Sequence, residues 1–143
     1  MRTAVTCARV ARLATVRADG RPHLVPVCFI LLGDVIYSAV DHKPKRGPRL
    51  ARLANVDATG VASLLVDDYG EDWATLWWVR LDGHATVVSD PADAAAAIAA
   101  LVAKYPQYAE RPPDGPVLAL TVDSWTGWSA APVDNDSSVS TEH

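Results

Sequence analysis

Two tight-turn signals within the first 40 residues of this 143-residue chain constrain its fold more than any other feature. The dipeptide Asp-Gly at positions 19–20 separates an apolar run at residues 11–16 from a second run at residues 23–32. Asp-Gly between two β-branched runs is a strong signal for a two-residue hairpin. A Gly-Asp turn at 33–34 leads into a third run at residues 35–40. We therefore predict that the chain begins with an antiparallel meander of three strands.

The remainder of the chain predicts further strands and two helices. Strands are expected at residues 61–67, 73–88 and 117–124, the middle stretch being a strand pair or one strand bent at Asp82-Gly83. Helical spacing of apolar residues predicts a short helix over residues 48–56. An Asp-Pro start before an alanine-rich stretch predicts a longer helix over residues 92–104.

This order of elements indicates a mainly β fold with short helices. About six strands joined mostly by tight turns are typical of a closed or nearly closed antiparallel barrel with its helices outside. A parallel α/β sheet would need helices between successive strands, and the first three expected strands have none. Chain length fits one domain, expected over residues 1–130, before a polar tail at 131–143 that we expect to be disordered.

Composition limits the location and the partners. Cys7 and Cys28 stand without other residues at metal-ligand spacing, which predicts free thiols in a reducing cytoplasm and no bound metal. The longest apolar run, residues 25–32, is far shorter than the roughly 20 residues of a membrane-spanning helix. A net charge of -4 argues against general binding of nucleic acid. We therefore expect a soluble protein that binds neither membranes nor nucleic acid.

One strongly basic segment departs from this acidic average. Residues 42–52, His-Lys-Pro-Lys-Arg-Gly-Pro-Arg-Leu-Ala-Arg, hold five of the 13 Lys and Arg residues and no acid. The segment runs from a loop into the start of an expected helix, where backbone N–H groups add to the positive charge. Lysine point charges and bidentate arginine forks suit a terminal phosphate. The alternative is a solvated loop and helix face, as in most basic runs.

Two further features point to a ligand or to a subunit interface. Alternation along a strand places Trp78 and Arg80 on one face, and Trp77 and Val79 on the other. One tryptophan is expected in the core, whereas the other is a candidate for a dimer surface or for a wall against an aromatic cofactor ring. The alternative is that both tryptophans only pack in the core. Pro26 cannot donate to a strand ladder, so it lies at a bulge or beside a ligand or solvent.

The order of these features resembles the pyridoxamine 5'-phosphate oxidase-like superfamily, over about residues 8–128. The resemblance rests on the first hairpin, on Val-Pro-Val at 25–27, on a strand that ends near Ser38, and on the basic loop, the short helix and Leu-Leu-Val at 64–66. Three stretches resemble the actinobacterial branch of F420-dependent enzymes: residues 41–45, 53–56 and 73–80.

The resemblance implies a homodimeric split β-barrel, of the FMN-binding split barrel type, with a cofactor in a groove between the subunits. The cofactor ring would lie along the second strand, and its phosphate would be held by the basic segment. The implied cofactor-binding residues are Val25, Pro26, Val27, Cys28, Ser38, Lys43, Lys45, Arg49, Arg52, Asn55, Trp78 and Arg80. Coenzyme F420 is preferred to FMN because the additional cations suit its lactyl-oligoglutamate tail.

The implied activity is F420-dependent oxidoreduction, in which the reduced deazaflavin delivers hydride and no side chain acts as a covalent catalyst. The alternatives are an FMN-dependent oxidoreductase, a non-catalytic F420- or flavin-binding protein, and a haem-binding barrel with His23 or His84 as axial ligand. Residues 125–129 replace the Arg-rich terminal motif of the true oxidase, which argues against a role in vitamin B6 synthesis.

Overall fold

The computed structural model describes residues 1–40, 50–131 and 140–141, in which eight strands form one sheet. The strand order is β2-β1-β5-β6-β7-β4-β3, with β8 beside β7. The strands are β1 (Ala11–Val16), β2 (Pro22–Val27), β3 (Ile30–Leu32), β4 (Val35–Ala39), β5 (Val61–Asp68), β6 (Trp77–Val88), β7 (Val117–Ser129) and β8 (Ser140–Thr141). The helices are α1 (Arg2–Cys7), α2 (Ala51–Thr59), the 3-10 turn η1 (Trp73–Thr75), α3 (Pro91–Lys104) and α4 (Pro106–Glu110).

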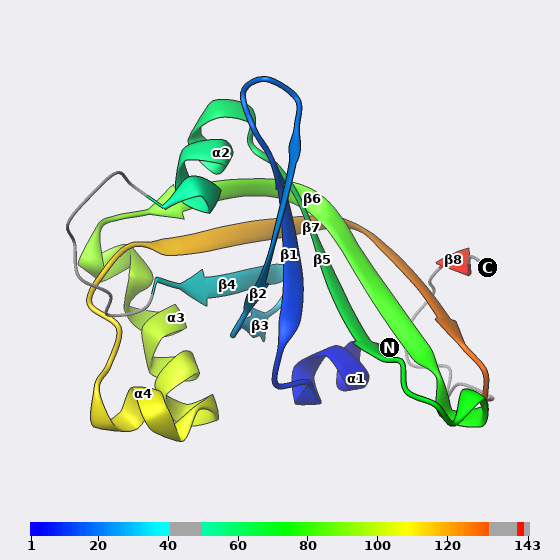
Figure 1. Ribbon diagram of the computed structural model, residues 1–143. Helices are drawn as coiled ribbons and strands as arrows, with labels where there is room; N and C mark the ends of the chain where they lie inside the picture. Colours follow the sequence, from blue (N-terminus) through cyan, green and yellow to red (C-terminus); the bar gives the residue numbers. More distant parts are fainter. Residues whose placement is uncertain (41–49, 132–139, 142–143) are drawn as a thin grey trace.

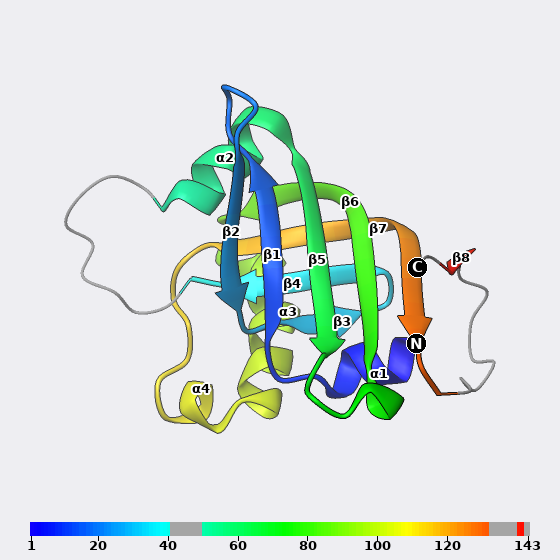
Figure 2. The same cartoon turned by 45° about the vertical axis from the view of Figure 1, so that its right-hand side comes forward.

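The sheet curls into the expected antiparallel barrel. Figure 2 shows β1, β2 and β5 in front, β4 and β3 running across behind them, and β6 and β7 bending from one layer into the other. All strand pairs are antiparallel except the parallel pair of β7 with the two-residue β8. The rest of the expected disordered tail lies outside the described residues. A mainly β split-barrel fold with short helices is therefore confirmed.

The first predicted hairpin is present between β1 and β2. The Arg17 N–H donates to the Arg21 carbonyl at 2.9 Å, and the Gly20 N–H donates to the Arg17 carbonyl at 2.8 Å. Gly20 has a φ of 89°, a left-handed conformation that glycine adopts without steric cost. Residues 18–20 form the tip, so the loop belongs to the three-residue class with a glycine at its end rather than to the expected two-residue class.

The predicted meander is wrong at its second strand. The run at 23–32 is divided at Cys28 and Phe29 into β2, which pairs with β1, and β3, which pairs with β4. Because β2 and β3 stand at opposite ends of the strand order, this one stretch of chain connects both ends of the sheet. We call Cys28 and Phe29 the strand break. Phe29 is fully buried, and its backbone is bonded to α3 instead of to a neighbouring strand.

The core lies inside the curled sheet. Burial alternates along β1 and β5, as expected for strands with one face buried. The largest fully buried side chains on the strands include Leu13, Ile36, Leu64, Leu81 and Leu120. Leu53 and Val56 of α2 close one end of this cluster. A smaller cluster lies under α3, where Ala94 and Ala97 pack beside Leu101, Tyr105 and Val117.

The helices agree only in part with the predictions. The short helix begins at Ala51 and ends at Thr59 instead of occupying 48–56, because Gly60 stops it in a left-handed conformation with a φ of 67°. The longer helix is confirmed: Asp90 accepts from the Ala92 N–H at 2.8 Å, and a proline occupies the first turn. Neither α1 nor α4 was expected.

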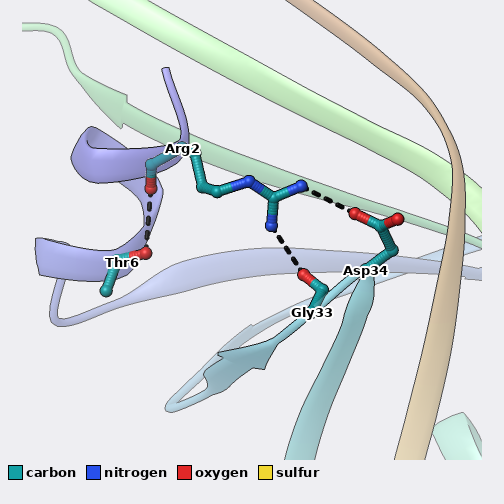
Figure 3. A network of polar contacts seen from close by, with 4 residues as sticks. All are labelled: Arg2, Thr6, Gly33 and Asp34. Carbon is teal, nitrogen blue, oxygen red and sulfur yellow. Dashed lines mark hydrogen bonds and ion pairs between the residues drawn. The ribbon is translucent and has the colours of Figure 1, made fainter. Parts of the chain in front are cut away.

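Val5 buries the N-terminal helix α1 against the core, and one arginine adds polar contacts to the sheet. Arg2 donates to the Gly33 carbonyl at 2.6 Å and to the Asp34 carboxylate at 2.7 Å, as Figure 3 shows. Thr6 donates to the Arg2 carbonyl at 2.9 Å, and the guanidinium lies 4.9 Å from the centre of a Trp125 ring. These contacts join α1 to the β3–β4 turn and to β7.

The long pair of β6 and β7 shows the predicted irregularity at Asp82 and Gly83, where the register shifts. A Cβ on Gly83 would lie 1.9 Å from the Thr121 carbonyl oxygen, so only glycine fits this close approach. The strand β7 reaches Ser129, five residues beyond the predicted end, because it pairs with the whole of β6. No helix within 1–40, 50–131 and 140–141 has both the length and the apolarity to span a bilayer.

Candidate functional site

A pocket of about 230 Å³ opens where β2 and β4 end. We call it the strand-end pocket, and its lining residues are Val10, Pro26, Val27, Cys28, Ser38, Ala39, Arg52 and Tyr108. Five of these, Pro26, Val27, Cys28, Ser38 and Arg52, are among the residues that the sequence predicted to bind a cofactor. Segments distant in the sequence therefore bring predicted residues together at one place.

Pro26 lies on an edge strand. It pairs with Arg12 of β1, and within the described residues β2 has no strand on its other side. A proline is tolerated there because an edge position does not require its missing N–H. Pro26 is exposed, Val27 is buried, and the partly buried Cys28 follows at the strand break. This edge presents an apolar, thiol-bearing wall to the pocket.

Described residues before the basic segment and at its C-terminal end line the same pocket. Ser38 and Ala39, both buried, end β4 just before the segment, and Arg52 lies in the first turn of α2. No acidic residue occupies that first turn, so the positive end of the helix dipole adds to the arginine charge. The predicted phosphate ligands Lys43, Lys45 and Arg49 lie outside the described residues.

The corner between α3 and α4 forms the remaining wall. Tyr108 of α4 lines the pocket, and its ring lies edge-on to the ring of Tyr105, with the centroids 5.7 Å apart. Figure 1 shows α3 and α4 side by side at one end of the barrel. Tyr105 is buried and ends α3, whereas the neighbouring Lys104 reaches the strand break. The sequence analysis did not predict α4 and therefore did not assign Tyr108 to the site. Pro106, in the first turn of α4, was the available signal for a helix start.

Two groups at this corner have shifted pKa values. Burial, with a smaller contribution from the nearby Arg9 cation, lowers the pKa of Lys104 to about 8. Its ammonium donates to the Phe29 carbonyl at 3.0 Å and lies 4.0 Å from the centre of the Phe29 ring. Burial also raises the pKa of the Tyr105 hydroxyl above its ordinary value. Both groups therefore titrate differently in the folded and unfolded chains.

Trp78 and Arg80 line a different cavity, on the outer side of β1, β5 and β6. This outer-face hollow has a volume of about 530 Å³ and is lined by Arg12, Ala14, Leu24, Ser63, Leu64, Leu65, Asp67, Tyr69, Trp78 and Arg80. The predicted division of faces is confirmed, since Val79 is buried on the inner side while Trp78 and Arg80 face the hollow. The two cavities adjoin β2 through Leu24 and Pro26, two exposed residues on the same face.

The charges in the outer-face hollow are paired. The Arg80 Nε donates to an Asp82 carboxylate oxygen at 2.9 Å, and the other oxygen of Asp82 accepts from the Ser63 hydroxyl at 2.5 Å. Arg12 lies 3.7 Å from Asp67 across the hollow. Leu24 and Tyr69, which are 68% and 62% exposed, add apolar surface that the described chain leaves uncovered.

Two predicted residues lie in neither cavity lining. Val25 packs against the core. Asn55 is buried, and its Nδ2 donates to the Thr15 hydroxyl at 3.0 Å. The two histidines considered as haem ligands are on separate strands: His84 is exposed, with its Nδ1 2.6 Å from Asp123, and His23 lies on β2. No group of three metal-ligating side chains occurs among the described residues.

Comparison with known proteins yields one family and a set of related folds. The sequence pattern of the pyridoxamine 5'-phosphate oxidase family matches residues 1–129. No curated protein matches the sequence at a significant level. A conserved hypothetical protein of Mycobacterium tuberculosis has a similar structure, with a TM-score of 0.73 and 19% identity over 95% of this chain and 89% of that one.

Two other similar structures carry descriptions that name a ligand. A FAD-binding protein from Mesorhizobium loti has a TM-score of 0.68 and 18% identity, covering 88% of this chain and 89% of its own. A heme storage protein from Vibrio cholerae has a TM-score of 0.69 and 14% identity, covering 90% of each chain. At such low identities these likenesses establish a shared fold and nothing about the ligand of this chain.

Proposed function

Because this chain belongs to the pyridoxamine 5'-phosphate oxidase family, we propose that it is a coenzyme F420-dependent oxidoreductase whose cofactor binds at the strand-end pocket. One observation carries the proposal: five residues predicted from the sequence line this single pocket, and they include Ser38 before the basic segment and Arg52 within it. F420 is preferred to FMN because residues 41–45, 53–56 and 73–80 resemble F420-dependent enzymes and because the basic segment holds more cations than one phosphate requires.

The residues divide into an anion-binding end and a ring-binding end. Arg52, the start of α2 and the basic segment with Lys43, Lys45 and Arg49 would hold the phosphate and the acidic tail. Pro26, Val27 and Cys28 would lie along the ring and exclude water from it. When bound, the deazaflavin supplies hydride chemistry, and the residues of the protein orient it next to the acceptor.

The size of the strand-end pocket favours a homodimer. Its 230 Å³ is less than the roughly 300–1,000 Å³ of usual small-molecule sites, so one described chain offers an incomplete site. We propose that a second copy covers the outer-face hollow, burying Leu24 and Tyr69 and bringing Trp78 and Arg80 to the cofactor. Stable interfaces of this kind bury more than about 1,000 Å². The proposed location is the cytoplasm, which keeps thiols such as Cys7 and Cys28 reduced.

Fluorescence titration of the purified protein with F420 and with FMN tests the proposal. We expect tighter binding of F420, and equal or reversed affinities would assign the protein to flavin instead. Arg52→Ala should weaken binding, whereas Arg21→Ala, at an exposed position on the first hairpin, is the matched control. Turnover of enones, quinones and tetrapyrrole-type acceptors with reduced F420 then separates an enzyme from a protein that only binds the cofactor.

Haem binding is the second candidate, favoured by one contact. Asp123 engages Nδ1 of the exposed His84, which leaves the other ring nitrogen facing away from the carboxylate, as in many metal-binding histidines. The fold of the Vibrio cholerae heme storage protein is similar. A Soret band that appears on haem addition and is lost in His84→Ala would support this candidate over the deazaflavin.

A further inference from the structure

Tyr105, at the C-terminal end of α3, contacts two neighbours on different sides of the strand-end pocket. Its hydroxyl lies 3.0 Å from the Phe29 amide nitrogen, next in sequence to the pocket residue Cys28. Its ring contacts the ring of the pocket residue Tyr108. Tyr105 is only 5% exposed and does not line the pocket, so it affects the pocket through its contacts with Phe29 and Tyr108.

The Tyr105 hydroxyl bonds the backbone of Phe29 at the strand break, where a neighbouring strand would otherwise do so. The Phe29 N–H donates to the Tyr105 oxygen, and that hydroxyl in turn lies 3.0 Å from the carbonyl oxygens of Phe29 and Arg9. A buried backbone N–H without a partner is costly, so these bonds favour a turn of the chain at Phe29. The turn between β2 and β3 therefore depends on a group that comes from α3.

Charged neighbours hold this tyrosine in place. Arg9 donates to the Lys104 carbonyl at 2.7 Å, and its guanidinium lies 4.8 Å from the centre of the Tyr105 ring. Lys104 donates to the Phe29 carbonyl from the other side, at 3.0 Å. The hydroxyl thus has a defined position relative to both Arg9, which precedes β1, and the strand break, and rotation of the ring would break several contacts at once.

We propose that Tyr105 is the positioning residue of the strand-end pocket, holding Cys28 and Tyr108 at the spacing that a planar cofactor ring requires. Its hydroxyl sets the strand break, and its ring sets α4. The link to a cofactor rests on the proposed function, whereas the effect on the two walls does not. Loss of the Tyr105 hydroxyl alone should make the chain at Cys28 more mobile, while the ring contact between Tyr105 and Tyr108 remains.

The reactivity of Cys28 reports on the wall without any cofactor. In a Cys7→Ser background, which removes the exposed thiol, a disulfide reagent would label Cys28 alone. We expect Tyr105→Phe to raise the labelling rate about tenfold, as for a local opening that has lost one buried hydrogen bond. The rate should be compared at its alkaline plateau, where the thiolate fraction no longer differs between variants. Thr75→Val, which removes an exposed hydroxyl bonded to the Asp72 carbonyl at 3.0 Å and outside both cavity linings, is the control.

Local loosening must be separated from loss of global stability. Labelling should be repeated in about 1 M urea, because a rate that passes through global unfolding rises with denaturant and a local opening does not. A rate for Tyr105→Phe that is equal to wild type, or that rises only with urea, would overturn the assignment.

Titration with F420 and FMN then distinguishes the two proposals. Faster labelling with cofactor affinity lowered about tenfold supports both the positioning role and the cofactor site. Faster labelling in a protein whose wild type binds neither cofactor supports the positioning role and refutes the proposed function. Tight cofactor binding with unchanged labelling refutes the positioning role alone.

Discussion

Asn55 of α2 donates a hydrogen bond to the Thr15 hydroxyl of β1 at 3.0 Å, with both side chains buried. The resemblance to known split barrels implied that Asn55 lies near a cofactor, whereas the structure gives it a partner in the core. We expect Asn55→Ala to lower the free energy of unfolding by about 1–3 kcal/mol, because it leaves the Thr15 hydroxyl unpaired. Urea denaturation measures this, and F420 titration of the same variant should show a smaller effect than Arg52→Ala. Cofactor loss without destabilisation would return Asn55 to the binding site.

The lowered pKa of Lys104 predicts a pH dependence of stability. In the unfolded chain the amine has its ordinary pKa of 10.5, so above about pH 8 the unfolded chain binds more protons than the folded one. Stability therefore rises with pH between about 8 and 10. The groups around the amine are Arg9, Tyr105 and the thiols of Cys7 and Cys28.

Lys104→Met separates this contribution from the others. Relative to the variant, the wild type should gain stability between about pH 8 and pH 10, as followed by chemical denaturation. Above pH 10 the raised pKa of Tyr105 opposes the trend in both proteins, because the unfolded tyrosine loses its proton first. Parallel curves for the two proteins would show that Lys104 titrates alike in both states.

The basic segment is tested by two substitutions. Lys45→Ala and Arg49→Ala should each weaken F420 binding by about 1–3 kcal/mol, the usual effect of losing a charge-assisted hydrogen bond. Added salt should weaken wild-type binding and affect the double variant less, since screening acts on the charges removed. Arg21→Ala, at an exposed position on the first hairpin, is the control. Unchanged affinity in both variants would make the segment a solvated loop.

The proposed homodimer predicts that a charge placed in its interface separates the two subunits. Leu24 is 68% exposed and lines the outer-face hollow, so Leu24→Asp should place a charge in the interface and shift the protein toward monomer. Light scattering at micromolar concentration, with and without cofactor, measures this. Leu32→Asp, at another exposed leucine, is the matched control. A wild-type monomer in the presence of cofactor would exclude the proposed interface.

The sequence predicted the fold well wherever local signals determine it. The position of the turn at Gly20, though not its two-residue class, the capped start of α3 and the alternating faces around Trp78 were visible in residue patterns and were confirmed. The strand break at Phe29 was not visible, because its cause is Tyr105, 76 residues away. The helix α1 has six residues and no side-chain cap, so the sequence offered no signal for it.

The candidate site was predicted in part. The family resemblance assigned the four consecutive residues 25–28 to the cofactor. Pro26, Val27 and Cys28, at the end of β2 and at the strand break, line the pocket. Val25, further inside the strand, packs against the core instead. Tyr108 could not be assigned because its place depends on the turn from α3 into α4, which is set by tertiary packing.

The placement of β4 affects how the protein folds during synthesis. Ile36 of β4 lies opposite Leu120 of β7, so the hairpin of β3 and β4 has no sheet neighbour until the last long strand has left the ribosome. Pairings between such distant segments slow folding. Chains are made from the N-terminus, and an unpaired strand edge is open to association with other chains in the meantime. We expect nascent chains that end before Val117 to be prone to aggregation. Residues 117–120 pair with both β4 and β6, so we expect their synthesis to complete the sheet.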